Sequence, residues 1–71
     1  MNITLEIESE HNELILNALK GEGAPNVNVK IYEKNGKLYI EIEGKSLSNV
    51  RAAFNSFIRW IDMVDRIASF L

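Results

Sequence analysis

The chain has 71 residues, a formal net charge of −2 and no cysteine, which excludes disulfide bonds and thiolate metal sites. The weak negative charge gives no overall attraction to nucleic acid or to an anionic membrane. Hydrophobic residues make up 46% and charged residues 25%, which indicates a folded domain, and no apolar run approaches the ~20 residues of a membrane span.

The short length of the chain limits its stability. Residues 1–71 form a single domain, and a domain of this size buries only about 60% of the surface that its unfolded chain exposes. Small domains often gain further stability from a disulfide, a metal or a partner chain. His11 is the one histidine and cysteine is absent, so a partner chain is the remaining candidate. The absence of cysteine also fits a reducing compartment, and the N-terminal residues do not resemble a signal peptide, so we expect the cytoplasm.

Three segments alternate between apolar and polar residues and are predicted to be strands. Each places its apolar residues on one face of a sheet and its polar residues on the other. The apolar residues are Ile3, Leu5 and Ile7 in the first, Val27, Val29 and Ile31 in the second, and Leu38, Ile40 and Ile42 in the third. Asn35 and Gly36 separate the second and third segments and tolerate the positive φ angles of a type I′ turn, which predicts a hairpin.

A first helix is predicted between the first and second strands. Ser9 can cap its N-terminus, and Gly21 can end it in the left-handed conformation. Leu16 falls on the side away from its apolar stripe and is expected to be exposed. His11, near the start of the helix, is expected to be packed or half-exposed rather than catalytic. The stripe itself is expected to consist of Leu14, Ile15, Ala18 and Leu19.

A second, longer helix is predicted after Gly44, with Ser46 or Ser48 as its cap. Its apolar seam recurs every three or four residues, at Leu47, Val50, Phe54, Phe57, Ile61, Val64, Ala68 and Leu71. A helix of about 24 residues is ~36 Å long, whereas strands of about seven residues span ~23 Å. The helix should therefore extend past its sheet by about two turns and need a partner to bury them. Those turns carry Val64, Ile67, Ala68, Phe70 and Leu71.

The order of the predicted elements, β-α-β-β-α, indicates an α+β fold. A helix between the first and second strands lets these strands run parallel, and the third strand, antiparallel to both, fits between them. We therefore expect a two-layer sandwich. A three-stranded antiparallel sheet in the order 1-3-2 is covered on one face by two helices.

The sequence offers no recognisable catalytic or cofactor-binding site. Ser9 is better explained as a helix cap than as a nucleophile, and the segment from Gly21 to Gly23 matches no phosphate-binding loop. The polar face of the sheet gathers four acids that could hold a hard cation, namely Glu6, Glu8, Glu41 and Glu43. A solvated face with Lys30 and Lys37 as counter-charges is the favoured interpretation. We therefore expect no metal and no cofactor, and a metal-dependent enzyme is a remote alternative.

An RNA-binding module is a second alternative, because small RNA-binding domains share this order of elements. The GXXG clamp of a KH domain is missing, and Tyr32 and Tyr39 on the polar face are more typical of a cross-strand pair than of an aromatic platform. Arginine favours interface contacts to carboxylate or phosphate, although a solvated, salt-bridged face is equally compatible with the pattern. The pattern in question is a stripe of polar residues along one face of the predicted second helix, at Arg51, Asn55, Arg59, Asp62 and Arg66.

The segment from Val50 to Trp60 resembles the signature helix of the small dimerising subunit of the KEOPS complex, a family that includes the CTAG antigens. The order of elements is also similar, over nearly the whole chain. The resemblance implies a non-catalytic scaffold in a complex that installs threonylcarbamoyladenosine in tRNAs that read ANN codons. The positions that match directly are Arg51, Asn55, Ser56, Arg59 and Trp60.

The partners implied by the resemblance are protein chains. It implies a homodimer, or a heterodimer with a paralogous small subunit, that docks on the ATPase-fold catalytic subunit and meets tRNA indirectly through the complex. The loop from Gly21 to Val29 departs from the family's pattern because it has no basic residue before Lys30, which argues against a tRNA contact there. The chain would suit the standard subunit or a paralogue of it. The expected partner interface consists of Arg51, Asn55, Ser56, Arg59, Trp60, Met63, Ile67 and Phe70.

Overall fold

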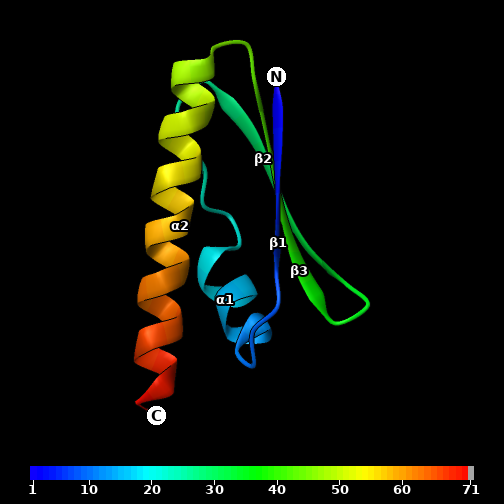
Figure 1. The fold of residues 1–71 in the computed structure, drawn as a ribbon, viewed down its shortest axis with the longest axis vertical. Coiled ribbons are helices and arrows are strands. Elements are labelled where there is room, and N and C mark those ends of the chain that lie inside the picture. The colour runs from blue at the N-terminus through cyan, green and yellow to red at the C-terminus, as the bar shows by residue number, and fades with distance from the viewer. Residues whose placement is uncertain (71) are drawn as a thin grey trace.

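The computed structural model describes residues 1–70 and contains five elements in the predicted order (Figure 1). They are β1 (Asn2–Ile7), α1 (Asn12–Leu19), β2 (Val27–Lys34), β3 (Lys37–Gly44) and α2 (Leu47–Ser69). The strands form one antiparallel sheet in the order β1-β3-β2, and both helices lie on the same side of it (Figure 1). The predicted α+β fold and its strand order are confirmed. Within residues 1–70, neither helix has the length and apolarity to cross a bilayer.

The hairpin between β2 and β3 forms at the predicted turn. Asn35 and Gly36 both have positive φ angles, of 54° and 78°, as a type I′ turn requires. The register that follows places Tyr32 opposite Tyr39. Their rings stack with centroids 5.3 Å apart and an interplanar angle of 17°, so the predicted cross-strand pair is confirmed.

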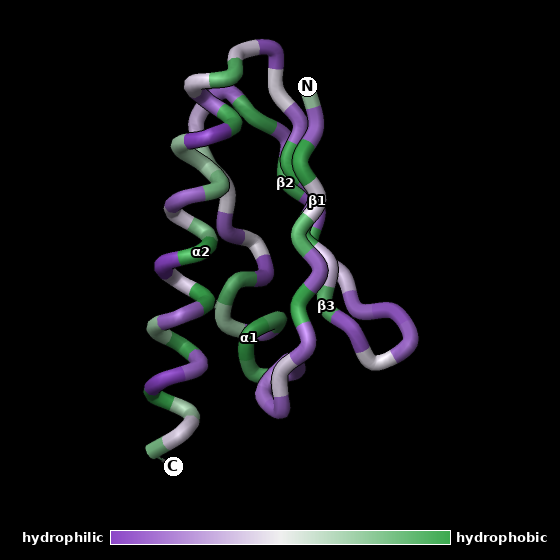
Figure 2. The backbone as a smooth tube through the Cα atoms, in the orientation of Figure 1, coloured by the Kyte–Doolittle hydropathy of each residue, from purple (hydrophilic) through white to green (hydrophobic). Residues whose placement is uncertain are grey.

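The core lies between the inner face of the sheet and the two helices. β3 is the central strand and contributes the most buried residues of the three strands, because it has a neighbouring strand on each side. Apolar and polar residues alternate along the strands, so that one face of the sheet is apolar (Figure 2). The buried residues of the core cluster are Ile15, Leu19, Leu38, Ile40, Ile42, Val50, Ala53 and Phe57.

The connection from β3 to α2 depends on a glycine and a cap. Ser46 Oγ accepts a hydrogen bond from the backbone N–H of Asn49 at 3.4 Å, so Ser46 is the cap of α2. Gly44 lies just before it, where β2 and α2 approach closely. A Cβ atom at Gly44 would lie 3.0 Å from a methyl carbon of Val27 and 3.0 Å from one of Val50. The absence of a side chain at Gly44 thus permits this contact between the two layers.

Replacing Gly44 by alanine should therefore destabilise the protein, by about 1–3 kcal/mol, because it overpacks the junction of the layers. Gly23→Ala is the matched control, since no heavy atom lies within 4 Å of a Cβ atom built at Gly23. That change should be neutral or slightly stabilising, because alanine restricts the unfolded chain. Urea unfolding of both variants measures the difference, and equal stabilities would contradict the close approach at Gly44.

The orientation of α1 differs from the sequence prediction. Its buried face consists of Asn12, Ile15 and Leu19, whereas Leu14, expected in the core, is 43% exposed. Leu16, expected to be exposed, is half-buried and packs against the core. The reason is a polar anchor, because Asn12 Nδ2 donates hydrogen bonds to the carbonyl oxygens of Ile7 at 3.3 Å and of Gly36 at 3.1 Å. These bonds turn the asparagine side of α1 toward the sheet.

The start of α1 also differs from the prediction. The helix begins at Asn12, and the preceding residue, His11, makes no capping hydrogen bond with its side chain. Ser9 Oγ accepts the backbone N–H of His11 at 3.0 Å, so it stabilises the turn before the helix rather than the helix itself. At the other end, Gly21 has the predicted positive φ angle, of 89°.

The seam of α2 is displaced relative to the prediction. Leu47 is 49% exposed and Phe54 is only half-buried, whereas Ala53 is buried. The extension beyond the sheet is also partly covered, because α1 lies against the second half of α2 (Figure 1). In this half Val64 is half-buried and Ala68 is buried. Exposed apolar residues remain on the side of α2 that turns away from α1. The predicted contribution of Leu71 lies outside the described residues.

Candidate functional site

Seven of the eight residues predicted for the partner interface lie on α2, on more than one side of it, and the eighth, Phe70, caps its C-terminal end. Successive helical residues are turned by about 100°. This places Met63, Ile67 and Phe70 on one side of α2 and Arg51 about a third of a turn away. The exposed surface of α2 is thus divided into two parts. Six of the eight residues are exposed, and the half-buried ones are Ser56 and Trp60.

The first part, which we call the distal face of α2, consists of Met63, Ile67 and Phe70. Their exposed fractions are 52%, 55% and 91%. Trp60 connects this face to the core, because its ring meets the buried ring of Phe57 edge-on, with centroids 5.1 Å apart. Arg59 borders the face and makes no ion pair with any residue from 1 to 70. The distal face is therefore an apolar surface at the C-terminal end of α2, with the Arg59 guanidinium at its edge.

The second part, which we call the lateral stripe, consists of Leu47, Arg51, Phe54, Ile58 and Asp62. Leu47 is 49% exposed and Ile58 is 42% exposed, and Phe54 is half-buried against the core. Arg51 makes no ion pair within residues 1–70.

Within residues 1–70, Asp62 is the one residue of the lateral stripe that has an ion-pair partner. Its Oδ2 lies 3.1 Å from Arg66 Nε, one turn later on α2, as the spacing predicts. Both side chains are mostly exposed, with fractions of 60% and 75%. An exposed pair of this kind contributes only about 0.3–0.5 kcal/mol, so the Asp62 carboxylate remains available to another partner.

A polar cluster that was not predicted from the sequence joins α1 to the second half of α2. Asp65 Oδ1 accepts a hydrogen bond from Ser9 Oγ at 2.7 Å and lies 3.1 Å from His11 Nδ1. Ser9 and Asp65 are separated by 56 positions in the sequence, so no local spacing could indicate the contact.

This cluster has the residue types of a Ser-His-Asp triad but not its arrangement. In a triad the histidine stands between the other two residues and takes the serine proton. Here the carboxylate of Asp65 stands between them and accepts a hydrogen bond from the Ser9 hydroxyl. Within residues 1–70 no histidine ring accepts a hydrogen bond from the Ser9 hydroxyl, so the cluster holds the turn before α1 against α2 and lacks the arrangement of a triad.

Replacing Asp65 by asparagine should remove part of the acid sensitivity of the protein. Hydrogen bonds from His11, and then from Ser9, hold the pKa of Asp65 below its ordinary value of 3.8. A carboxyl with a lower pKa in the folded state adds stability above its unfolded-state pKa, and loses it as the pH falls through the folded-state pKa. Urea unfolding between about pH 7 and pH 2 should therefore show a steeper loss in the wild type than in Asp65→Asn. Parallel curves would show that Asp65 is not coupled to folding.

The polar face of the sheet is an ion-paired surface. Lys37 Nζ lies 2.9 Å from Glu6 Oε1 and 3.2 Å from Glu8 Oε1, so Lys37 is the counter-charge that the sequence indicated. These contacts lower the pKa of Glu6 and raise the pKa of Lys37 above its usual range. Within the described part of the chain, no three histidine, aspartate or glutamate side chains come close enough to share a metal ion.

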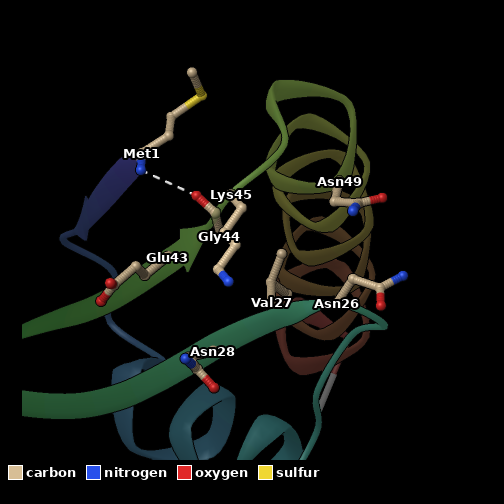
Figure 3. A pocket seen from close by; sticks show the side chains of 8 residues that line it. All are labelled: Met1, Asn26, Val27, Asn28, Glu43, Gly44, Lys45 and Asn49. Carbon is tan, nitrogen blue, oxygen red and sulfur yellow. Dashed lines mark hydrogen bonds between the residues drawn. The ribbon is translucent and has the colours of Figure 1, made fainter.

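An open groove of about 590 Å³ lies where β2 begins, β3 ends and α2 starts (Figure 3). Three asparagines line it from β2, the residue before β2 and the first turn of α2, and Glu43 and Lys45 add one charge of each sign. The backbone closes its edge, since the Met1 amino group donates to the Gly44 carbonyl oxygen at 3.0 Å. The lining contains no hydroxyl or thiol that could serve as a nucleophile. The asparagines are Asn26, Asn28 and Asn49.

A comparison with known protein families gives a match that covers nearly the whole chain. A family model described as transcription factor Pcc1 matches residues 1–69, which spans all five elements. No curated protein matches the chain. The match includes the segment from Val50 to Trp60, on which the resemblance to the small KEOPS subunit rests. The chain therefore belongs to the Pcc1 family, a family of subunits of the KEOPS complex.

Proposed function

We propose that this protein is a non-catalytic scaffold subunit of KEOPS that supports threonylcarbamoyladenosine modification of ANN-decoding tRNAs. It acts in the cytoplasm as a homodimer or as a heterodimer with a paralogous small subunit. It docks on the ATPase-fold catalytic subunit through its helices and meets tRNA indirectly, through the complex. The observation that carries the proposal is the exposed, apolar distal face of α2.

The distal face supports docking because leaving it in water is costly. Burying a Met, Ile or Phe side chain contributes about 1.5–3 kcal/mol. Met63, Ile67 and Phe70 together thus represent several kcal/mol, which is comparable to the whole stability of a small domain. Apolar residues gathered on one side of a helix mark interaction surfaces. The bordering Arg59 suits a carboxylate on the partner.

The polar groups of the chain support a non-catalytic role. Nucleophilic catalysis needs a hydroxyl or thiol beside a base. The Ser9 hydroxyl is instead occupied by Asp65, and the His11 Nδ1 atom lies against the same carboxylate.

The charge distribution favours a protein partner over nucleic acid. Binding to DNA or RNA depends on lysine and arginine that neutralise phosphates. The chain has a net charge of −2, and Lys37 on the sheet is already neutralised by two glutamates. The groove at the end of the sheet carries both signs of charge. These features count against an independent RNA-binding module and against direct contact with DNA.

The proposal is tested by mixing the purified chain with the KEOPS catalytic subunit and measuring their association by size-exclusion chromatography with light scattering. We expect a defined complex. Arg59→Glu should weaken it, because it repels a partner carboxylate at the edge of the distal face, while circular dichroism remains that of the wild type. Failure of the wild-type chain to associate would refute the docking role, and an unchanged affinity of Arg59→Glu would remove Arg59 from the interface.

A further inference from the structure

The turn between β2 and β3 holds the one Asn-Gly pair of the chain in an exposed position. The sequence has eight asparagines, and only Asn35 is followed by a glycine. Asn35 and Gly36 are both exposed and help to line an open hollow of about 480 Å³, so solvent reaches the turn. Gly36 lies outside both strands, and within residues 1–70 its N–H donates to no backbone carbonyl.

We propose that Asn35 is a site of spontaneous deamidation to aspartate or isoaspartate, and that the isoaspartate product releases α1 from the hairpin turn. Asparagine is among the thermolabile residues. Solvent hydroxide takes the proton of the Gly36 N–H, and the nitrogen attacks the side-chain carbonyl carbon of Asn35. The new C–N bond closes a succinimide ring, while the side-chain nitrogen takes a proton from water and leaves as ammonia, which regenerates hydroxide. Water then opens the ring at one carbonyl to give aspartate or at the other to give isoaspartate.

The residue after the asparagine determines which site reacts first. Gly36 has no Cβ atom to hinder the approach of its nitrogen, and a Cβ atom built there would meet no heavy atom within 4 Å. Asn26 is the internal comparison, because it is also exposed and also has a positive φ angle, of 63°. It is followed by Val27, whose β-branched side chain shields the nitrogen that would attack. Asn35 should therefore react well ahead of Asn26.

The two products should differ in their effect on the hairpin. Asp-Gly is a favoured pair in a type I′ turn, as Asn-Gly is, so the aspartate product should keep the turn. In isoaspartate the main chain runs through the former side chain and gains a methylene group. The length of the turn fixes the register of a hairpin, here Lys34 opposite Lys37. Isoaspartate should therefore displace the turn from its present position.

A displaced turn affects α1 through Asn12, which is only 6% exposed. Its Nδ2 donates to the carbonyl oxygen of Gly36 at 3.1 Å and to that of Ile7 at 3.3 Å. Its Oδ1 is buried and has no hydrogen-bond partner within residues 1–70, so the amide depends on these two bonds. A buried polar group that loses a partner destabilises the fold. Isoaspartate at position 35 should thus loosen the start of α1, whereas aspartate should not.

Incubation of the folded, full chain at neutral pH, followed by peptide mapping with mass spectrometry, tests the site. Deamidation raises the mass of the peptide that contains the asparagine, and methylation by a protein isoaspartyl methyltransferase identifies isoaspartate. We expect Asn35 to be the first asparagine to convert and to yield both products. Conversion at Asn35 that is no faster than conversion at Asn26 would overturn the assignment of the site.

A chain synthesised with isoaspartate in place of Asn35 tests the coupling to α1. Asn35→Asp is the matched control, because both chains carry the same added carboxylate. Isoaspartate should lower the urea unfolding midpoint and shift the side-chain amide signals of Asn12 in a nitrogen–proton NMR spectrum, whereas Asn35→Asp should leave both close to those of the wild type. Identical midpoints and Asn12 signals in the two chains would refute the release of α1.

Asn12→Ala shows whether the loss passes through the anchor. The bond to Gly36 is already absent in this variant, so isoaspartate should lower its unfolding midpoint by less than it lowers that of the wild type. An equal loss with and without the Asn12 side chain would show that the displaced turn destabilises the hairpin alone, and would overturn the coupling to α1.

Discussion

Truncating Phe57 to alanine should remove about 3–5 kcal/mol from the free energy of unfolding, the largest loss that we expect of any single substitution in this chain. Phe57 is fully buried and lies among residues of both helices and the sheet in the core cluster. Removing a buried phenylalanine side chain costs about 3–5 kcal/mol. A domain of this length is stable by roughly 4–11 kcal/mol, at about 0.05–0.15 kcal/mol per residue. The truncation also removes the ring on which Trp60 packs. Urea unfolding followed by circular dichroism should therefore show a much lower unfolding midpoint than that of the wild type.

Phe54→Ala is the control for this prediction, because it removes the same side chain from the same helix. Phe54 is only half-buried, although the apolar seam of the sequence placed it in the core. Its truncation should cost about 1–2 kcal/mol, in proportion to the smaller buried area, and should leave a folded protein. Equal losses in the two variants would show that Phe57 is not the centre of the core.

Replacing both Ile67 and Phe70 by serine should abolish docking on the KEOPS catalytic subunit while the fold survives. The two side chains are 55% and 91% exposed, so they contribute little to the isolated chain. Serine and isoleucine have similar helix propensities, so α2 should persist. Central apolar residues of an interface cost about 2 kcal/mol or more when truncated, and the double change should weaken binding by at least about 100-fold. Titration calorimetry with the catalytic subunit measures the loss.

Leu47→Ser is the matched control for the docking prediction. Leu47 is 49% exposed and also lies on α2, but it belongs to the lateral stripe. This variant should bind the catalytic subunit as the wild type does. An undiminished affinity of the Ile67→Ser, Phe70→Ser double variant would show that the distal face is not the docking surface. A loss as large in Leu47→Ser would show that docking is not confined to that face.

The features that could be predicted from the sequence are those set by neighbouring residues. Asn35 and Gly36 form the predicted turn because both tolerate the positive φ angles that a type I′ turn requires. The alternation of apolar residues along the three strands fixes which face is buried, since side chains of a strand point to alternate sides. The strand order then follows from the helix between β1 and β2 and from the hairpin.

The orientation of α1 could not be predicted, because contacts distant in the sequence determine it. A helix of 8 residues has little more than two turns, so several orientations of its apolar stripe are almost equally good. Two hydrogen bonds from Asn12 decide between them, and their acceptors lie on β1 and in the hairpin turn. The same holds for Asp65, whose contacts with Ser9 and His11 depend on how α1 packs against α2.

The candidate interface was predictable as a helix but not as two surfaces. The spacing of its polar and apolar residues indicates that they lie on the exposed part of α2, and six of the eight are exposed. Which of these residues form one continuous exposed surface depends on which side of α2 packs against the core. Leu47, predicted to be buried, is exposed and joins Arg51 and Ile58 in the lateral stripe. Because the buried seam of α2 is displaced in this way, the lateral stripe forms a second exposed surface in addition to the distal face.

The most direct test of the scaffold role is the threonylcarbamoyladenosine content of an ANN-decoding tRNA treated with a KEOPS complex reconstituted with and without this chain. The chain alone should neither hydrolyse ATP nor modify the tRNA. Added to the other subunits, the wild-type chain should raise the yield, and the Ile67→Ser, Phe70→Ser double variant should not. Equal yields with and without the wild-type chain, or modification by the chain alone, would contradict a non-catalytic scaffold role.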